Sequence, residues 1–363
     1  MHLVPHAARM RSLIIHGDYT DVYMASFLFR TPSPALQFLE IKAFECLVSL
    51  PDNFLGQQAL SLRSIDLTGV HPALESPLAL PNLIDFKLSL PRIVGSFRMG
   101  ALFQLLSGCP RLRKICIHLR ETPGYITLDQ VISLESLEEL DYSCNPVGRV
   151  LPYLRLPRIK RLQVATSFGL GRTHKVADIL PCGGHALLAG ATKILYKFEE
   201  RFQAVELSGM GTRVLFTEFH PAAYRTPVDW FFDETSIPFG QIEALSVRGF
   251  VAMDFPIRAL NFKNLKLLQM VKWSPEFAEG LLRLFQPLPG VEVPCQSLRE
   301  IRYTHRGSMG PLIDLVRERK RAGHQLGLVR LSIISGYPCD GDLVEELKKH
   351  VRKVLIQDET GPL

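Results

Sequence analysis

The chain has 363 residues, of which 47% are hydrophobic and 21% charged, and its 42 Lys and Arg residues against 36 Asp and Glu residues give a net charge of +6. It has no run of about 18 apolar residues and no apolar secretory signal, so we expect a soluble cytoplasmic or nuclear protein, not secreted and without a membrane partner. Its seven cysteines include no CxxC pair, which is typical of small core residues in a reducing compartment.

One apolar skeleton recurs along the chain and predicts its strands. In residues 109–117 (CPRLRKICI), apolar residues stand at positions 109, 112, 115 and 117, and the final alternation is that of a strand with one buried face. The full skeleton returns at residues 80–88, 134–142, 156–164, 262–270 and 295–303. A shorter core returns at residues 10–15, 36–41, 62–67, 202–207, 242–247, 328–333 and 351–356.

The spacing of these thirteen predicted strands indicates a repeat protein. Most steps between them are 21 to 33 residues, in or near the leucine-rich-repeat range of about 20 to 29. The prediction is therefore an α/β leucine-rich-repeat solenoid, a curved parallel β-sheet with helices and loops on its convex side and irregular repeats. We expect one domain over residues 1–363, with an irregular inserted region at about 165–241, because the steps there (159 to 202 to 242) are 43 and 40 residues.

Helices are predicted between several of these strands. Residues 99–108 place Leu102, Leu105 and Leu106 on one stripe and end in a glycine. Ser274-Pro275 predicts another helix start, and Gly310-Pro311 opens a helix with residues 312, 315 and 316 inward. Arg317, Arg319, Lys320 and Arg321 cluster at its end, where basic side chains offset the helix dipole. Near the C-terminus, Asp342 and Glu345 resemble a capping pair.

Two surfaces are candidates for partner binding. Inside the inserted region, Trp230, Phe231 and Phe232 could anchor a partner, or could pack irregularly against the convex side. The polar positions within the strand cores are expected on the concave face, where they form either a solvated charge ladder or a surface that recognises a protein or peptide. These concave residues are Arg113, Lys114, Glu138, Glu139, Asp141, Lys160, Arg161, Lys266, Arg299 and Arg302.

No catalytic, cofactor or metal site is predicted. The segment 169–175 (GLGRTHK) lacks the spacing of a phosphate-binding loop. Cys182 and His185, with His174 upstream, lack a second close-spaced pair of zinc ligands. His118 and His305 are expected just past strands, as ordinary imidazoles. An α/β enzyme with an unrecognised active site is one alternative. Another is nucleic-acid binding by the basic C-terminal repeats, since residues 299–353 hold twelve basic and seven acidic residues.

The HAxRxRSL-like entry at residues 6–13, the CPRLRKI and LPRIKRL units, and GDLVEELKKHVRKV at residues 341–354 together resemble the repeat region of fungal F-box-like leucine-rich-repeat proteins. The resemblance implies the substrate-recognition region of an SCF ubiquitin ligase, in which an F-box docks on a Skp-type adaptor and the repeats choose the protein to be ubiquitinated. We expect no F-box in the nine residues before the first repeat, so an adaptor would bind only if an F-box is supplied elsewhere. Asn145 alone stands where the LxxLxLxxN pattern places its asparagine.

Overall fold

A computed structural model describes the chain except for residues 1–3, 45–47, 51–58, 72–79, 91–98, 120–129, 144–149, 167–179, 200–201, 220–238, 250–261, 272–274, 288–291, 306–308, 335–339 and 360–363. It divides into two compact units, Met1–Gly184 and His185–Leu363, here called unit 1 and unit 2. No helix in the described part of the chain is long and apolar enough to cross a membrane.

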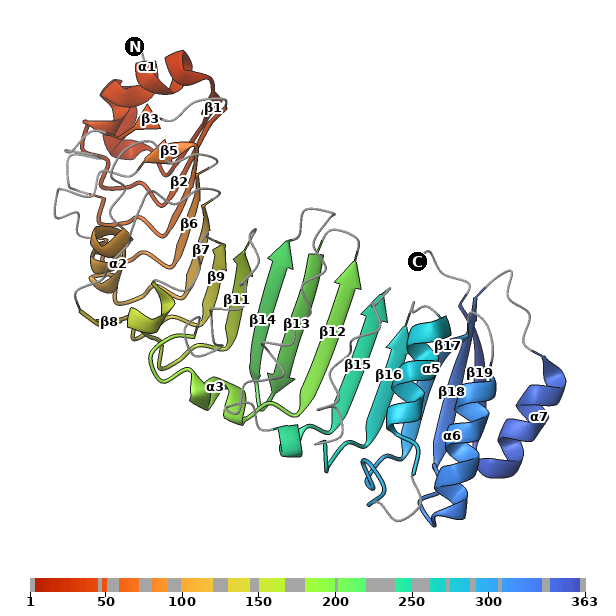
Figure 1. Cartoon of the computed structure of the whole chain (residues 1–363). Coiled ribbons are helices and arrows are strands. Elements are labelled where there is room, and N and C mark those ends of the chain that lie inside the picture. The colour runs from red at the N-terminus through yellow and green to blue at the C-terminus, as the bar shows by residue number, and fades with distance from the viewer. Residues whose placement is uncertain are drawn as a thin grey trace. The chain divides into compact units, whose positions relative to one another are not determined.

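Unit 1 is built on a sheet of seven parallel strands that lie side by side in chain order (Figure 1). These strands are β1 (Ser12–Gly17), β2 (Phe38–Ala43), β4 (Ser64–Thr68), β6 (Asp85–Leu90), β7 (Lys114–Leu119), β9 (Glu139–Ser143) and β11 (Arg161–Thr166). Two short ladders pair β3 (Val48–Ser49) with β5 (Val70–His71) and β8 (Ile132–Ser133) with β10 (Leu154–Arg155). The helical segments are η1 (Val4–Arg9), α1 (Tyr19–Phe29), α2 (Met99–Ser107) and η4 (Leu151–Tyr153).

Unit 2 combines an antiparallel meander with a second parallel ladder. Strands β12 (Lys193–Glu199), β13 (Phe202–Gly209) and β14 (Thr212–Phe219) are antiparallel neighbours. From β12 onward the ladder is parallel through β15 (Ala244–Gly249), β16 (Leu267–Val271), β17 (Glu300–His305), β18 (Leu328–Ile334) and β19 (Val354–Glu359). Its helical segments are α3 (His185–Ala189), η6 (Phe239–Gln241), α5 (Pro275–Leu284), α6 (Gly310–Arg321) and α7 (Gly341–His350). Helices α5, α6 and α7 follow one another over one face of the sheet (Figure 1).

The recurring skeleton produces one tight turn and one strand in each repeat. In the 109–117 copy, the backbone N–H of Leu112 donates to the carbonyl of Cys109 at 3.1 Å, which closes a turn over the apolar-x-x-apolar step. The carbonyl of Arg113 then accepts the N–H groups of Glu138 and Glu139, at 2.8 and 2.9 Å. Because the turns of successive repeats are joined in this way, the strands stay in register.

The thirteen predicted strands are all present, and the α/β repeat fold with mostly parallel strands is confirmed. The exception is the strand predicted at 202–207, which is β13 and runs antiparallel to both of its neighbours. Most of the thirteen strands begin about two residues later than predicted, since the first apolar residue of each core lies in the turn. Along β7 the side chains of Ile115, Ile117 and Leu119 are buried, whereas Lys114, Cys116 and His118 lie on the opposite face. The apolar skeleton therefore builds the core and leaves every second strand residue on a polar face.

Several local predictions were wrong. Strands β12 and β14 were missed, and the meander that they form with β13 occupies part of the region predicted as irregular. In α2 the side chain of Phe103, rather than Leu105, is buried with Leu102 and Leu106. The N-cap of α7 is Asp340, whose carboxylate accepts from the N–H of Asp342 at 2.9 Å.

The basic cluster at the end of α6 also differs from its prediction. Arg319 is fully buried rather than exposed at the helix end, because its guanidinium donates to backbone carbonyls of the segment after α5. His118 and His305 lie within β7 and at the last position of β17, not beyond those strands.

Candidate functional site

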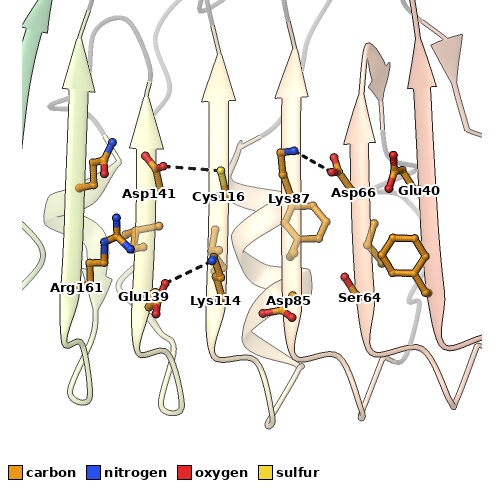
Figure 2. A pocket seen from close by; sticks show the side chains of 16 residues that line it. Glu40, Ser64, Asp66, Asp85, Lys87, Lys114, Cys116, Glu139, Asp141 and Arg161 are labelled. Atoms are coloured by element: carbon orange, nitrogen blue, oxygen red, sulfur yellow. Dashed lines mark hydrogen bonds and ion pairs between the residues drawn. The ribbon is translucent and has the colours of Figure 1, made fainter. Parts of the chain in front are cut away.

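A hollow of about 470 Å³ lies on the polar face of unit 1, across strands β2, β4, β6, β7, β9 and β11 (Figure 2). Every second residue of each strand faces the hollow, and the parallel register places equivalent residues of successive repeats side by side. The floor of the hollow therefore consists of rows of side chains. The first row across the hollow is Phe38, Ser64, Asp85, Lys114, Glu139 and Arg161. The second row is Glu40, Asp66, Lys87, Cys116, Asp141 and Gln163.

Charged side chains pair between neighbouring strands of these rows. Lys87 Nζ lies 2.8 Å from Asp66 Oδ2, and this hydrogen bond raises the pKa of Lys87. Lys114 Nζ lies 3.5 Å from Glu139 Oε2. Such pairs are partly exposed, so each contributes little stability, and both remain open to a partner.

Glu40 lies at one end of the hollow, between Lys42 and His16. Its Oε1 lies 2.6 Å from Lys42 Nζ and 2.7 Å from His16 Nε2. The hydrogen bond from Lys42, and then that from His16, lower the pKa of Glu40. Glu40 is therefore a carboxylate at neutral pH, and its Oε1 already takes part in both contacts.

The hollow is acidic although the chain as a whole is basic. Its lining contains five carboxylates and three cations, a balance of 3 − 5 = −2, against +6 for the whole chain. In addition, Oδ1 of Asp66 and Oδ1 of Asp141 are buried and accept no hydrogen bond among the described residues. Buried acceptors without a donor are unfavourable by about 1–3 kcal/mol each, and a positive charge near these carboxylates reduces that cost, so the floor favours a cationic ligand.

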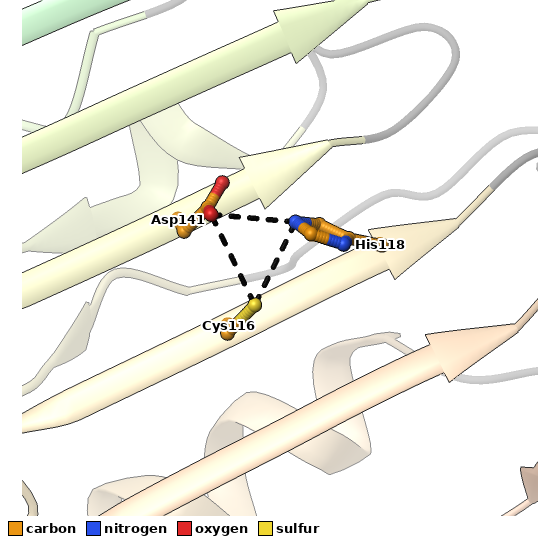
Figure 3. A group of neighbouring side chains, drawn as sticks. All are labelled: Cys116, His118 and Asp141. Carbon is orange, nitrogen blue, oxygen red and sulfur yellow. Dashed lines mark hydrogen bonds and ion pairs between the residues drawn. The ribbon is translucent and has the colours of Figure 1, made fainter. Parts of the chain in front are cut away.

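Cys116, His118 and Asp141 form a compact cluster at the edge of the hollow (Figure 3). His118 Nε2 lies 3.6 Å from Cys116 Sγ and 3.4 Å from Asp141 Oδ2, and the sulfur and that oxygen are 4.0 Å apart. The hydrogen bond to Asp141, followed by that to Cys116, raises the pKa of His118 to about 10. His118 is thus an imidazolium at neutral pH when no other cation occupies the cluster.

The predicted concave residues fall into two groups. Lys114, Glu139, Asp141 and Arg161 line the hollow. Arg113, Glu138 and Lys160 instead lie just before their strands, at the edge of the sheet, where Lys160 Nζ pairs with Glu138 at 2.9 Å. Their binding role stays a prediction.

In unit 2, Lys266 and Arg299 occupy the same edge position, and Lys266 Nζ lies 2.6 Å from Glu243. Arg302 is on the strand face of β17, with its Nε 2.8 Å from Glu300. Trp230, Phe231 and Phe232, and also His174 of the possible zinc set, lie outside the described residues. Cys182 of that zinc set is described, and it is exposed.

Sequence reasoning missed five polar residues that line the hollow, and it treated His118 of the neighbouring cluster as an ordinary imidazole. The signal was available, because the residues concerned occupy the polar positions of the strand cores in the first repeats and at the end of the 109–117 copy. They are Glu40, Asp66, Asp85, Lys87, Cys116 and His118.

The basic residues of the last repeats are largely engaged within unit 2. Arg317 contacts Asp314 and Glu346, at 3.1 and 3.3 Å. Arg330 and Arg302 both reach Glu300, at 2.9 and 2.8 Å. This pairing gives no support to a phosphate-binding surface there.

No protein-family model matches the chain. A search of curated proteins also gives no match. Among solved structures, a leucine-rich-repeat (LRR) protein of Leptospira interrogans is similar, with 14% sequence identity, a TM-score of 0.31, and coverage of 96% of this chain and 90% of that one. Because that TM-score is low, the assignment of the fold rests on the strand pairing described above.

Proposed function

We propose that this chain is a protein-binding repeat domain and that the hollow of unit 1 holds a basic segment of its partner. The observation that carries the proposal is the acidic lining of the hollow, where the side chains of Asp66 and Asp141 are 17% and 31% exposed. Lysine and arginine side chains supply N–H donors to such carboxylates together with the charge that an acidic hollow attracts. The net charge of the lining, −2, points to the same class of ligand.

The register also suggests a spacing for the ligand. Asp66 on β4 and Asp141 on β9 are three strand steps apart, or about 14 Å at about 4.8 Å per step. An extended peptide advances about 3.3 Å per residue, so two residues four positions apart span about 13 Å and point to the same side. We therefore expect a peptide that crosses the strands with Arg or Lys at positions i and i+4.

Selection from a displayed library of random short peptides tests this proposal. Peptides selected on the full chain should be enriched in two basic residues four positions apart, and Asp66→Asn should weaken their binding at least about tenfold, the effect of losing one charged contact. Glu243→Gln in unit 2 is the matched control, because this partly exposed carboxylate pairs with Lys266 outside the hollow. Enrichment of acidic peptides, or equal effects of both substitutions, would count against the proposal.

A narrower role comes from the resemblance to F-box-like proteins. In that role the bound protein is a substrate for an SCF-type ubiquitin ligase, and a Skp-type adaptor binds an F-box supplied elsewhere. Co-purification with the adaptor tests it, comparing the chain alone with the chain fused behind an F-box. The fusion should retain the adaptor and direct ubiquitin to a bound protein that carries the selected basic segment. A fusion that retains the adaptor but never modifies such a protein would contradict this role.

A further inference from the structure

The Cys116, His118 and Asp141 cluster offers three different donor atoms to one point in space. Its thiol, imidazole and carboxylate come from neighbouring strands, and the three donor atoms lie within 4.8 Å of one another (Figure 3). Cys116 and His118 are two residues apart on β7, so their side chains share one face of the sheet. Asp141 stands opposite Cys116 on β9 in the parallel register.

The spacing of the donors fits three corners of a metal tetrahedron. With bonds of about 2.3 Å to sulfur and about 2.0 Å to nitrogen and oxygen, tetrahedral zinc places sulfur about 3.5 Å from both N and O, and N and O about 3.3 Å apart. The corresponding distances in the cluster are 3.6, 3.4 and 4.0 Å. Only the separation between Cys116 Sγ and Asp141 Oδ2 would have to shorten, by about 0.5 Å.

The same geometry does not suit a nucleophile relay. In such a relay, one ring nitrogen of the histidine faces the nucleophile and the other faces the carboxylate. Here both Cys116 Sγ and Asp141 Oδ2 approach Nε2 of His118. Convergence on one nitrogen is the arrangement expected when three donors surround a cation.

The backbone holds the cluster in place while leaving it open. Strand β7 is hydrogen-bonded on both sides, to β6 and β9, and the side chains of Ile115, Ile117 and Tyr142 anchor β7 and β9 in the core with no exposed surface. The ligands themselves reach solvent, since the side chains of His118 and Asp141 are 44% and 31% exposed. An ion can therefore enter without rearrangement of the sheet.

We propose that Cys116, His118 and Asp141 bind a transition-metal ion of the zinc class, with the fourth position open to water or to a donor from a partner. A mixed set of sulfur, nitrogen and oxygen ligands is one that zinc accepts. Coordination requires the thiolate of Cys116 and a neutral imidazole at His118, so the thiol proton and the proton on Nε2 both pass to solvent. The cation also reduces the penalty of the buried Asp141 Oδ1, which has no donor among the described residues.

Titration of the full, metal-free chain with Co²⁺ tests the site, since a cobalt–thiolate bond gives an ultraviolet charge-transfer band and tetrahedral Co²⁺ absorbs strongly in the visible. Wild type should bind one equivalent with both signals and release it to Zn²⁺, which binds more tightly at such sites than Co²⁺. Cys116→Ser should lose the charge-transfer band. His118→Gln and Asp141→Asn should each weaken binding at least about tenfold.

The matched controls replace residues of the same three types that lie outside the cluster. They are Cys182→Ser, an exposed cysteine elsewhere; His16→Gln, a histidine paired with a carboxylate on β2; and Asp66→Asn, the equivalent row position on β4. All three should keep wild-type Co²⁺ binding. Absence of the thiolate band in wild type, or equal loss in a control, would overturn the proposal; circular dichroism shows that each variant is folded.

The metal site and the peptide-binding hollow can be tested separately. His118 does not line the hollow, and Asp66 is not a metal ligand in the proposal. Peptide binding measured with a chelator present and metal binding measured without peptide give two separate readouts. His118→Gln should weaken only metal binding, whereas Asp66→Asn should weaken only peptide binding.

Discussion

Replacing the buried Arg319 by methionine should destabilise unit 2 much more than its position in a basic helix end suggests. Its side chain has no exposed surface. Nη1 donates to the carbonyl of Pro294 at 2.8 Å, and Nη2 donates to that of Cys295 at 2.9 Å. Cys295 has a φ of 48° and its carbonyl also accepts from the N–H of Leu298. The guanidinium therefore fixes the turn that leads into β17.

The magnitude follows from the groups left behind. The substitution Arg319→Met would leave the carbonyl of Pro294 without its charged donor, at about 1–3 kcal/mol, and would also remove the charge-assisted bond to Cys295, whose carbonyl keeps the N–H of Leu298. It would at the same time remove a buried charge whose burial is itself unfavourable. The desolvation that lowers the pKa of Arg319, and Nε without a partner among the described residues, account for this second contribution. We expect a net loss of about 2–4 kcal/mol in the free energy of unfolding.

Urea unfolding followed by circular dichroism measures this loss, and hydrogen exchange at the Leu298 amide localises it. Arg321→Met is the matched control, because that side chain is 68% exposed and pairs with Glu318 in the same helix. Its loss should stay below about 1 kcal/mol. If both substitutions have the same effect, or if Arg319→Met stabilises unit 2, the role assigned to Arg319 is refuted.

Three further changes test other parts of the structure. Met210 and Gly211 form the two-residue turn between β13 and β14, and both have positive φ (46° and 83°). Asparagine adopts positive φ more easily than methionine, so Met210→Asn should raise the free energy of unfolding by about 0.5–1 kcal/mol and move the urea midpoint to higher concentration. Hydrogen bonds from Lys349, then from His350 and Arg317, lower the pKa of Glu346 from 4.5 to about 2. Stability from this group is present above pH 4.5 and is lost as the pH falls towards 2, so Glu346→Gln should flatten that part of the urea-midpoint profile. Iodoacetamide should alkylate Cys116 before Cys109 in peptide mass spectra, because burial raises the pKa of the Cys109 thiol to about 11.

The fold of the repeats could be predicted because the apolar positions of the skeleton are the buried positions of the structure. Leu112, Ile115 and Ile117 are apolar since each is at most 2% exposed, and the same requirement recurs wherever a turn stacks on the next. Strand β14 lacks the apolar-x-x-apolar turn, because a hairpin joins it to β13. Strand β12 does follow such a turn, closed by the N–H of Ala191 and the carbonyl of Leu188 at 3.0 Å, and sequence reasoning overlooked it because a small alanine stands there in place of a larger apolar residue. Gly-Met-Gly at residues 209–211 was the available signal for that hairpin.

The candidate site was predictable only in part. Alignment of the repeat at 112 with that at 137 places Cys116 opposite Asp141. The contact between these two residues could therefore have been predicted from the repeat spacing. The concave face was instead assigned partly to residues before the strands, such as Arg113 and Glu138, whose side chains lie at the sheet edge. The burial of Arg319 depends on carbonyls 24 and 25 residues away in the chain, and no local pattern contains that information.

In residues 109–117, the side chains that stabilise the fold differ from those on the polar face that can meet a ligand. Cys109 opens the turn, is 5% exposed and bonds the carbonyl of Leu105 through its sulfur, so its substitution would disturb the core. Cys116 lies on the other face of the same repeat, away from the buried side chains of β7. A repeat can therefore gain or lose metal ligands and charges on its polar face without loss of the fold, because the residues that specify the strand are not those that meet a ligand.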